Sequence, residues 1–312
     1  MTEPAAPSPE RIAFLGLGRM GSAMAERLAT ARGELVVWNR DDAKARDLAT
    51  RLADVSRVTV ASTPREAVEG RSMVVSMLAD ETALDAVLSG PDGALSGIAP
   101  GTVWVDMSTV GPAAVATTYE RLAQSGASLV DAPVSGSVGF ARDGTLTVMC
   151  GGATQDVESA RAVLGVLASR WIACGPSGTG AALKLGVNLV VHALNASLSE
   201  ALVMVERAGV ARSTAFDLFT NSAVAAPFVA YKRAAFEDPD QAPVAFSLEL
   251  VEKDLRLIAA LERQLGTPTG VSDTVAALVR DACANGLGQH DMSALAAHFR
   301  ASAGTSRDQT RI

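Results

Sequence analysis

The chain has 312 residues, more than one hydrophobic core usually holds, which predicts two domains. Hydrophobic residues make up 48% and charged residues 20%, a balance that excludes a disordered chain. The net charge of −7 disfavours nucleic acid and anionic membranes as partners, because both are negatively charged. An anionic substrate would need a local cationic site.

The cysteine pattern bears on the compartment. Cys150, Cys174 and Cys283 are odd in number, lie far apart and have no C-x-x-C spacing. They form no disulfide framework, and with so few histidines we expect no metal site. We therefore expect a reducing, cytoplasmic environment. The start, MTEPAAPSPE, has no cationic or apolar region, so we expect a disordered leader and not a signal peptide.

From residue 11 onward, short apolar runs alternate with helical stretches, which is typical of a doubly wound parallel sheet in an α/β protein. Strands are expected at 11–16, 34–38, 57–60, 72–78, 102–107, 128–132, 145–151 and 169–175. Helices are expected between them at 21–31, 41–53, 82–88, 112–124 and 154–168. The Gly/Pro cluster 175–180 ends this pattern and marks a domain boundary.

The remainder of the chain has a helical period. Helices are expected at 180–209, 212–221, 247–265 and 269–285. The longest apolar stretch, 183–205, is interrupted by polar residues, which favours a buried helix over a membrane span. The last dozen residues are polar, and we expect them to fray. The pattern predicts an α/β domain over 10–176 and an all-helical domain over 177–301.

A glycine-rich segment directly follows the first expected strand. RIAFLGLGRMG places Gly16, Gly18 and Gly21 in G-x-G-x-x-G spacing at the start of a helix. Gly16 permits a tight turn, Gly18 lets the backbone approach a pyrophosphate, and Gly21 lets helix and strand pack closely. The helix N-terminus offers N–H groups to an anion, and Arg19 can add charge. The segment predicts dinucleotide binding; a glycine-rich turn without a ligand is the alternative.

The end of the second strand bears on the choice of cofactor. An acidic residue there would bind a ribose diol, whereas an arginine would pair with a 2′-phosphate. The strand ends in Asn39-Arg40, so Arg40 favours NADPH, with help from Lys44. Asp41 and Asp42 follow at once and either repel the phosphate or cap the next helix. NADH stays open, and so does a solvated surface role for Arg40.

The segment GTGAALKLGVN carries the candidate proton donor. Lys184 and Asn188 are spaced i, i+4 and share a helix face, to which Asn195 nearly returns. Burial penalises the charged form of a lysine, which makes Lys184 a candidate for proton transfer. A lysine that extends to the surface beside a capping glycine is the alternative.

Two other segments carry polar side chains. After Asp131, the turn through Ser135, Gly136 and Ser137 offers hydroxyl and N–H groups that can hold a carboxylate. An ordinary Ser-Gly loop is the alternative. In SLELVEKDLRLIAAL, Lys253 lies amid mixed charge, where a solvated ion-pair face is the default interpretation.

The three histidines are not expected to take part in catalysis. No Ser-His-Asp or Cys-His order stands out in the sequence. His192 lies in an apolar helix and is predicted to be a core residue with satisfied hydrogen bonds. His290 and His298 are predicted to be uninvolved.

These segments together resemble the β-hydroxyacid dehydrogenase superfamily, which includes 3-hydroxyisobutyrate dehydrogenases and glyoxylate/succinic semialdehyde reductases. The motifs that carry the resemblance are FLGLGRMG, SMLAD, DMSTVGP, DAPVSGS, DGTLTVMCGG, GTGAALKLGVN and EKDLRL. It implies an NADP-binding Rossmann domain over 10–176 and an all-helical substrate and dimerisation domain, like that of 6-phosphogluconate dehydrogenase, over 177–301. It also implies a homodimer.

The resemblance further implies roles for individual residues. Lys184 would be the general acid in carbonyl reduction and the base in alcohol oxidation, with Asn188 helping to orient the substrate. The turn 135–137 would hold the substrate's carboxylate, and Lys253 would lie near nicotinamide and substrate. Cofactor contacts are implied for Gly16, Leu17, Gly18, Arg19, Met20, Gly21, Asn39, Arg40, Leu78, Ala79, Thr109 and Lys253.

Some positions depart from the superfamily's pattern. Asp41 stands where NADPH-preferring members usually have Ser or Thr, and Ala79 replaces the usual Pro. Val187 stands where many members carry a further Asn, and Ser137 where many have Gly. Phe140 adds bulk in the same loop. Asp41 weakens the expected preference for NADPH, and the change at Ala79 is minor, whereas Val187, Ser137 and Phe140 point to an atypical substrate pocket.

The leading hypothesis is NAD(P)-dependent interconversion of a small carboxylate-bearing semialdehyde or keto acid and its hydroxyacid. An NADPH-dependent imine reductase is the alternative, disfavoured because that branch commonly replaces the residue at Lys184. A non-catalytic dinucleotide-binding module has no reason to keep Lys184 and Asn188 together. The expected partner is a small-molecule carboxylate. Nucleic acid and membranes are not expected as partners.

Overall fold

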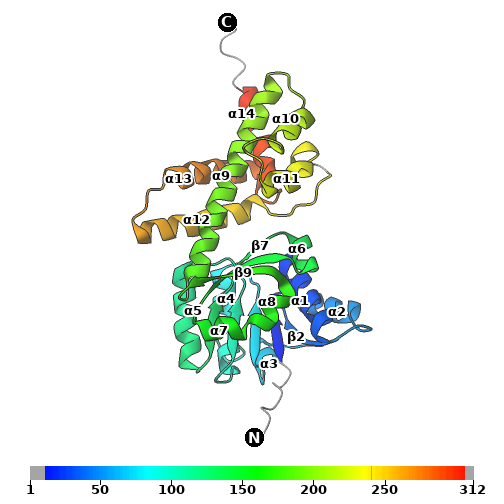
Figure 1. Cartoon of the computed structure of the whole chain (residues 1–312), viewed down its shortest axis with the longest axis vertical. Coiled ribbons are helices and arrows are strands. Elements are labelled where there is room, and N and C mark those ends of the chain that lie inside the picture. Colours follow the sequence, from blue (N-terminus) through cyan, green and yellow to red (C-terminus); the bar gives the residue numbers. More distant parts are fainter. Residues whose placement is uncertain (1–10, 240, 306–312) are drawn as a thin grey trace. The chain divides into compact units, whose positions relative to one another are not determined.

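The computed structural model describes residues 11–239 and 241–305. Packing divides the chain into two compact units, with the division between Lys184 and Leu185. Figure 1 shows a sheet covered by helices in the first unit and helices alone in the second. This is the predicted fold class.

The first unit is built on a sheet whose strands are mostly parallel. The strands are β1 (Ile12–Leu15), β2 (Glu34–Trp38), β3 (Arg57–Val60), β4 (Met73–Ser76), β5 (Val103–Asp106), β6 (Ser128–Asp131), β7 (Val134–Ser135), β8 (Leu146–Gly151) and β9 (Ala168–Gly175). The order begins β3-β2-β1-β4-β5-β6, as in doubly wound nucleotide-binding sheets. Strand β8 then pairs antiparallel with β6 and β7 and parallel with β9.

Helices cover both faces of this sheet. One face carries α1 (Arg19–Arg32), α2 (Asp42–Arg51), α6 (Val138–Asp143) and α8 (Arg161–Leu167). The other carries α3 (Pro64–Val68), α4 (Glu81–Leu88) and α5 (Pro112–Gln124). Every residue of β1, β4 and β5 is buried. This explains why these strands are continuous apolar runs and do not alternate.

In its described residues, the second unit consists of helices and the segments that connect them. The helices are α9 (Thr179–Arg207), which begins in the first unit, α10 (Arg212–Phe219), α11 (Pro227–Glu237), α12 (Leu248–Leu265), α13 (Gly270–Ala282) and α14 (Leu295–Thr305), with short turns at Cys283–Leu287 and Met292–Ala294. One core joins Leu185 to Leu248 and Leu255 of α12 and to Val279 of α13. A second core surrounds Phe216.

Helix α9 meets the length and hydropathy criteria for a membrane span, with 29 residues and a mean hydropathy of 1.3 over its most apolar window. However, 44% of that window is buried inside the protein. Its polar residues Asn188, His192 and Asn195 are buried as well. Burial of this kind is typical of the central helix of a bundle.

Several predicted boundaries were wrong. The expected helix over 154–168 is two helices, α7 (Thr154–Ser159) and α8, because α7 buries none of its residues whereas α8 packs Val163 and Leu164 into the core. The turn after Ser135 contains the short helix α6. Helices α3 and α11 were missed, although each begins with proline at its first turn, a recognisable start signal.

The expectation for the chain ends was partly wrong. Residues 301–305 continue α14 as a helix, and Leu295 and Ala296 pack this helix into the two cores of the helical unit. Residues 306–312 and the expected leader 1–10 lie outside the described residues.

Candidate active site

The glycine loop has the geometry that its spacing predicts. Gly16 has a φ of 98°, and a Cβ there would clash with the carbonyl oxygen of Met77 at the end of β4. A Cβ on Gly21 would clash with the carbonyl oxygen of Gly16. Gly18 instead has no atom within 4 Å of a built Cβ, so its backbone faces open space. The two outer glycines permit tight packing, and Gly18 leaves room for a ligand.

The start of α1 is not capped by a side chain. Its N-cap is Gly18, and its first turn contains no acidic residue. In contrast, Asp41, Thr63 and Asp80 cap α2, α3 and α4 with their side chains. The exposed N–H groups at the start of α1 therefore fit a pyrophosphate, so the residues present suit a nicotinamide dinucleotide.

Asn39 holds the glycine loop against the end of β2. Its side-chain oxygen accepts a hydrogen bond from Leu17 N at 2.8 Å, and its amide donates to the backbone oxygen of Asp41 at 2.9 Å. The carboxylate of Asp41 accepts from Ala43 N at 3.2 Å. Of the two predicted alternatives, Asp41 therefore caps the next helix.

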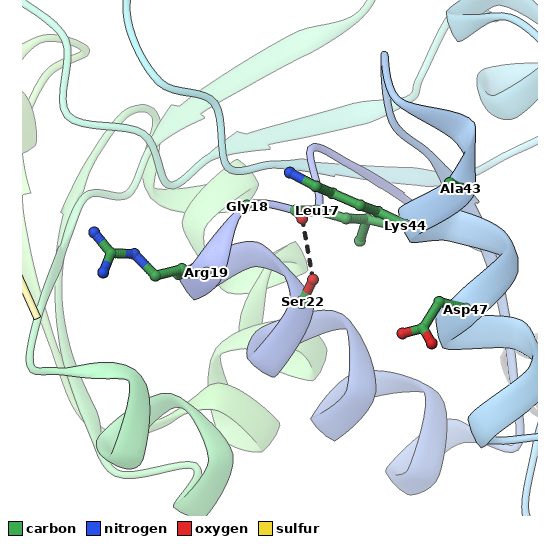
Figure 2. A pocket seen from close by; sticks show the side chains of 7 residues that line it. All are labelled: Leu17, Gly18, Arg19, Ser22, Ala43, Lys44 and Asp47. Atoms are coloured by element: carbon green, nitrogen blue, oxygen red, sulfur yellow. Dashed lines mark hydrogen bonds between the residues drawn. The ribbon is translucent and has the colours of Figure 1, made fainter. Parts of the chain in front are cut away.

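A groove of about 400 Å³ lies between the starts of α1 and α2 (Figure 2). It is lined by Leu17, Gly18, Arg19, Ser22, Ala43, Lys44 and Asp47. In Figure 2, Lys44 extends from α2 over the loop at Leu17, whereas Arg19 points away from α2. Arg40, exposed between β2 and α2, is not among these lining residues. Sequence reasoning treated Lys44 as secondary and missed Ser22 and Asp47.

A buried network that the sequence did not predict fixes the loops after β4 and β5. Asp106 Oδ1 accepts from Ser76 Oγ at 2.7 Å and from Ser108 Oγ at 2.6 Å. Trp104 donates to Ser76 Oγ at 2.8 Å, and Leu78 N donates to Ser108 Oγ at 2.8 Å. Burial raises the pKa of Asp106, although the hydrogen bonds from Ser108 and Ser76 oppose the shift.

The loops after β4 and β5 carry three predicted cofactor residues. Leu78 is half-buried two residues after β4 and is followed by exposed Ala79, and Thr109 is half-buried after β5. They follow adjacent parallel strands, as β4 pairs with β5, and so lie at the same edge of the sheet as the glycine loop. Met20 is half-buried and packs on the core beneath α1. The structure therefore brings these predicted cofactor residues to one edge of the sheet.

The start of α9 is tied to the end of β6. Gly178 N and Ala181 N donate to the carboxylate of Asp131 at 2.8 and 2.9 Å. A Cβ on Gly180 would clash with the carbonyl oxygen of Met149 in β8. Lys184 follows Ala181 by three residues and is half-buried. The position of this lysine is thus fixed by contacts within the first unit.

The predicted carboxylate-binding turn follows β7. Ser135 pairs with Thr147 across the sheet and is half-buried. Gly136 has a φ of 138°, and a Cβ there would lie 2.9 Å from Leu146 Cδ2 and 3.0 Å from Phe140 Cβ. Ser137 begins α6 without a side-chain cap. The exposed Phe140 therefore packs directly against this turn.

In the helical unit, Asp254 joins two predicted site residues. Asn188 Nδ2 donates to Asp254 Oδ2 at 2.6 Å, and Lys253 Nζ lies 3.1 Å from Asp254 Oδ1. Asn188 is buried, and the Lys253 side chain is only 15% exposed, so the default of a solvated ion pair was wrong. Sequence reasoning missed Asp254 because nothing local links it to Asn188, 66 residues away.

The sheet order and the glycine loop define a dinucleotide-binding protein of the Rossmann type. Two family profiles match the chain: the NAD binding domain of 6-phosphogluconate dehydrogenase at residues 11–175, and the NAD-binding domain of NADP-dependent 3-hydroxyisobutyrate dehydrogenase at residues 178–299. The chain belongs to the family of 3-hydroxyisobutyrate dehydrogenases and glyoxylate reductases, which are NAD(P)-dependent oxidoreductases acting on CH–OH groups.

Individual relatives agree with this assignment. Glyoxylate/succinic semialdehyde reductase 1 of Arabidopsis thaliana is 32% identical, over 91% of this chain and 96% of that protein. The 3-hydroxyisobutyrate dehydrogenase of Mycobacterium tuberculosis with L-serine has a TM-score of 0.81 and 27% identity, over 94% of this chain and 100% of that chain. An imine reductase from a Pseudomonas species shares the fold at 20% identity and a TM-score of 0.61, over 94% of this chain and 100% of that chain.

Proposed function

We propose that the protein is an NADPH-linked reductase of a small carboxylate-bearing carbonyl compound, a semialdehyde or a keto acid, and that Lys184 transfers the proton. The observation that carries this proposal is Lys184 itself, half-buried and one turn beyond a helix start that Asp131 fixes. The names of the relatives, glyoxylate/succinic semialdehyde reductase among them, support the substrate class.

In this mechanism the bound nicotinamide supplies the hydride. The ammonium group of Lys184 donates a proton to the carbonyl oxygen during reduction, and its neutral amine accepts one during oxidation. Asn188 orients the substrate with an amide that Asp254 holds at 2.6 Å. The turn of Ser135, Gly136 and Ser137 binds the carboxylate through hydroxyl and N–H groups.

The preference for NADPH is part of the proposal. Arg40 and Lys44 flank the start of α2 and would pair with a 2′-phosphate, while Lys253 would lie near the nicotinamide. The capping bond from Ala43 N to Asp41 supports this preference, because the carboxylate is held on the helix end. Lys44 lines the groove beside Gly18 and Arg40 does not, so Lys44 is the stronger candidate for binding the 2′-phosphate.

We further propose a cytoplasmic homodimer. Val190 and Met204, 66% and 64% exposed, lie fourteen residues apart on α9 and so share one exposed face of this helix. Apolar side chains exposed on one helix face are suited to pairing with a second copy. Light scattering on the purified protein measures the mass directly, and a monomer at micromolar concentration would exclude this assembly.

The function is tested by following reduced-cofactor absorbance with NADPH and NADH in parallel. The substrates are glyoxylate, succinic semialdehyde, methylmalonate semialdehyde, tartronate semialdehyde and one cyclic imine. Turnover of an acid semialdehyde with NADPH supports the proposal. Turnover of the imine alone would move the protein to imine reduction, and binding of NADPH without any turnover would indicate a non-catalytic module.

The role of Lys184 has its own test. We expect Lys184→Ala to lower kcat by about 10²- to 10⁴-fold, because that is the usual contribution of general acid catalysis. The dissociation constant for NADPH should change little. The matched control is Leu183→Ala, at the neighbouring position, where 42% of the side chain is exposed. Wild-type turnover in Lys184→Ala would reject the assignment.

A further inference from the structure

His192 is buried but not satisfied, contrary to the sequence-based expectation. Its side chain is only 2% exposed, and neither ring nitrogen has a hydrogen-bond partner among the described residues. His298, also buried in the helical unit, differs because its Nε2 lies 3.0 Å from Asp281 Oδ2. Buried polar groups without partners are uncommon, since each one costs free energy, so those of His192 call for an explanation.

His192 faces the carboxylate that holds two proposed site residues. Its Nε2 lies 3.5 Å from Asp254 Oδ2, the same oxygen that accepts from Asn188 at 2.6 Å. The other oxygen, Oδ1, is 3.1 Å from Lys253 Nζ. The carboxylate of Asp254 therefore contacts an amide and an ammonium group and has an imidazole close by.

One aromatic side chain also packs against His192. The ring of Phe246, from the segment before α12, stacks on the imidazole with centroids 6.1 Å apart. Behind this segment lies a buried ion pair, in which Asp291 accepts from Phe246 N and binds Lys232. Since Lys232 already neutralises Asp291, Asp254 is the acidic group that faces the imidazole directly.

The geometry distinguishes the two charge states of the imidazole. When the ring is neutral, its Nε2 lies 3.5 Å from Asp254 Oδ2 and makes no hydrogen bond to any described residue, so the carboxylate of Asp254 binds Asn188 and Lys253. A protonated ring would place a second cation beside this carboxylate in a poorly solvated region, where charges interact strongly. It would compete with Asn188 for Oδ2 and weaken the attraction between Lys253 and Asp254.

We propose that His192 is a positioning residue that acts through Asp254, keeping Asn188 and Lys253 in place when neutral and releasing them when protonated. The proposal rests on the proposed function only in so far as Asn188 and Lys253 serve the reaction. It adds a dependence on pH that originates in the helical unit. Histidine is the side chain that ordinarily changes charge between about pH 5 and about pH 8.

The first test compares pH profiles of kcat/KM for wild type and His192→Leu, a variant of similar volume that cannot be protonated. As the pH is lowered from about 8 to about 5.5, kcat/KM of the wild type should fall. The fall in kcat/KM of His192→Leu over the same range should be about threefold smaller. The control, His298→Leu, should keep the wild-type profile. Parallel profiles for wild type and His192→Leu would overturn the proposal while leaving the proposed function intact.

The second test needs neither turnover nor a variant that folds well. The wild-type protein is labelled with 13C-histidine and 15N-asparagine. The chain has three histidines, so the ring-carbon NMR signals are few enough to follow individually through a pH titration. We expect the signal of His192 and the side-chain amide signal of Asn188 to shift together. Independent movement of the two signals would overturn the link through Asp254, even if the protein proved to have no reductase activity.

Discussion

The carboxylate of Asp131 accepts a hydrogen bond from the backbone N–H of Ala181 at 2.9 Å, which ties the end of β6 to the first turn of α9. The same carboxylate accepts from Gly178 N at 2.8 Å. Burial raises the pKa of Asp131, and the two backbone N–H groups oppose that shift. A side chain of the sheet therefore supplies the cap of the helix that carries Lys184.

Removing this cap should affect both stability and activity. We expect Asp131→Ala to lower the free energy of unfolding by about 1–3 kcal/mol, because one buried and one partly buried N–H group lose their acceptor. It should also lower kcat by misplacing Lys184. Urea denaturation and steady-state kinetics measure the two effects. Unchanged kcat in a destabilised variant would show that Lys184 does not depend on this contact.

Cofactor choice should respond to the two cations near α2. We expect Arg40→Ala and Lys44→Ala each to raise KM for NADPH by about tenfold, since a charged hydrogen bond contributes about 1.5–3 kcal/mol. KM for NADH should change little. The control is Arg46→Ala, on the same helix, whose side chain pairs with Asp42 in solvent. Equal effects on both cofactors would mean that these residues do not contact the 2′-phosphate.

The buried Asp106 gives a prediction that separates charge from hydrogen bonding. Because burial raises the pKa of Asp106, the fold disfavours its charged form. Asp106→Asn keeps an acceptor oxygen for Ser76 and Ser108 and should cost less stability than Asp106→Ala, by about 1–2 kcal/mol. Urea denaturation of both variants measures this difference. Equal losses of stability in Asp106→Asn and Asp106→Ala would show that the acceptor oxygen at this position is not needed for stability.

The ion pair of Lys232 and Asp291 should be sensitive to acid. Lys232 Nζ lies 2.7 Å from both carboxylate oxygens, and although burial alone would raise the pKa of Asp291, this contact lowers it. We expect Lys232→Met to cost about 3–5 kcal/mol at neutral pH, because it leaves a buried charge unpaired. Thermal denaturation at a series of pH values measures the effect.

The direction of the pH effect follows from the lowered pKa of Asp291. Stability from this pair is present above the ordinary aspartate pKa of about 3.9 and is lost as the pH falls through the lower folded value. In Lys232→Met the unpaired carboxyl gains a proton more readily. The stability difference between wild type and variant should therefore shrink in acid, and a difference that is constant with pH would exclude this explanation.

The sequence predicted features that depend on local spacing. Buried parallel strands form continuous apolar runs, and the loop of Gly16, Gly18 and Gly21 is specified by residues close together in the chain. Tertiary partners could not be predicted in this way. Asn188 and Asp254 are 66 residues apart, and Ser76 and Asp106 are 30 apart. Each residue type was visible, but its partner was set by which strands and helices pack together.

The same limit applies to His192. An apolar stretch of sequence around a histidine predicts burial, and this side chain is indeed buried. Whether its ring nitrogens find partners depends on the rotation of α9 against α12, which brings up Asp254. Hydrophobic periodicity does not predict that rotation accurately enough to say which side-chain atoms lie within hydrogen-bond distance.

The uncapped start of α1 links ligand binding to thermal stability. Since no side chain among residues 11–239 and 241–305 caps this turn, a dinucleotide pyrophosphate gains N–H contacts in the folded protein that an unfolded chain cannot offer. Such a ligand raises the free energy of unfolding by about 2.7 kcal/mol at a concentration of 100 Kd. The melting temperature of this protein would therefore report the level of its cofactor, and cells short of cofactor would hold less of it in folded form.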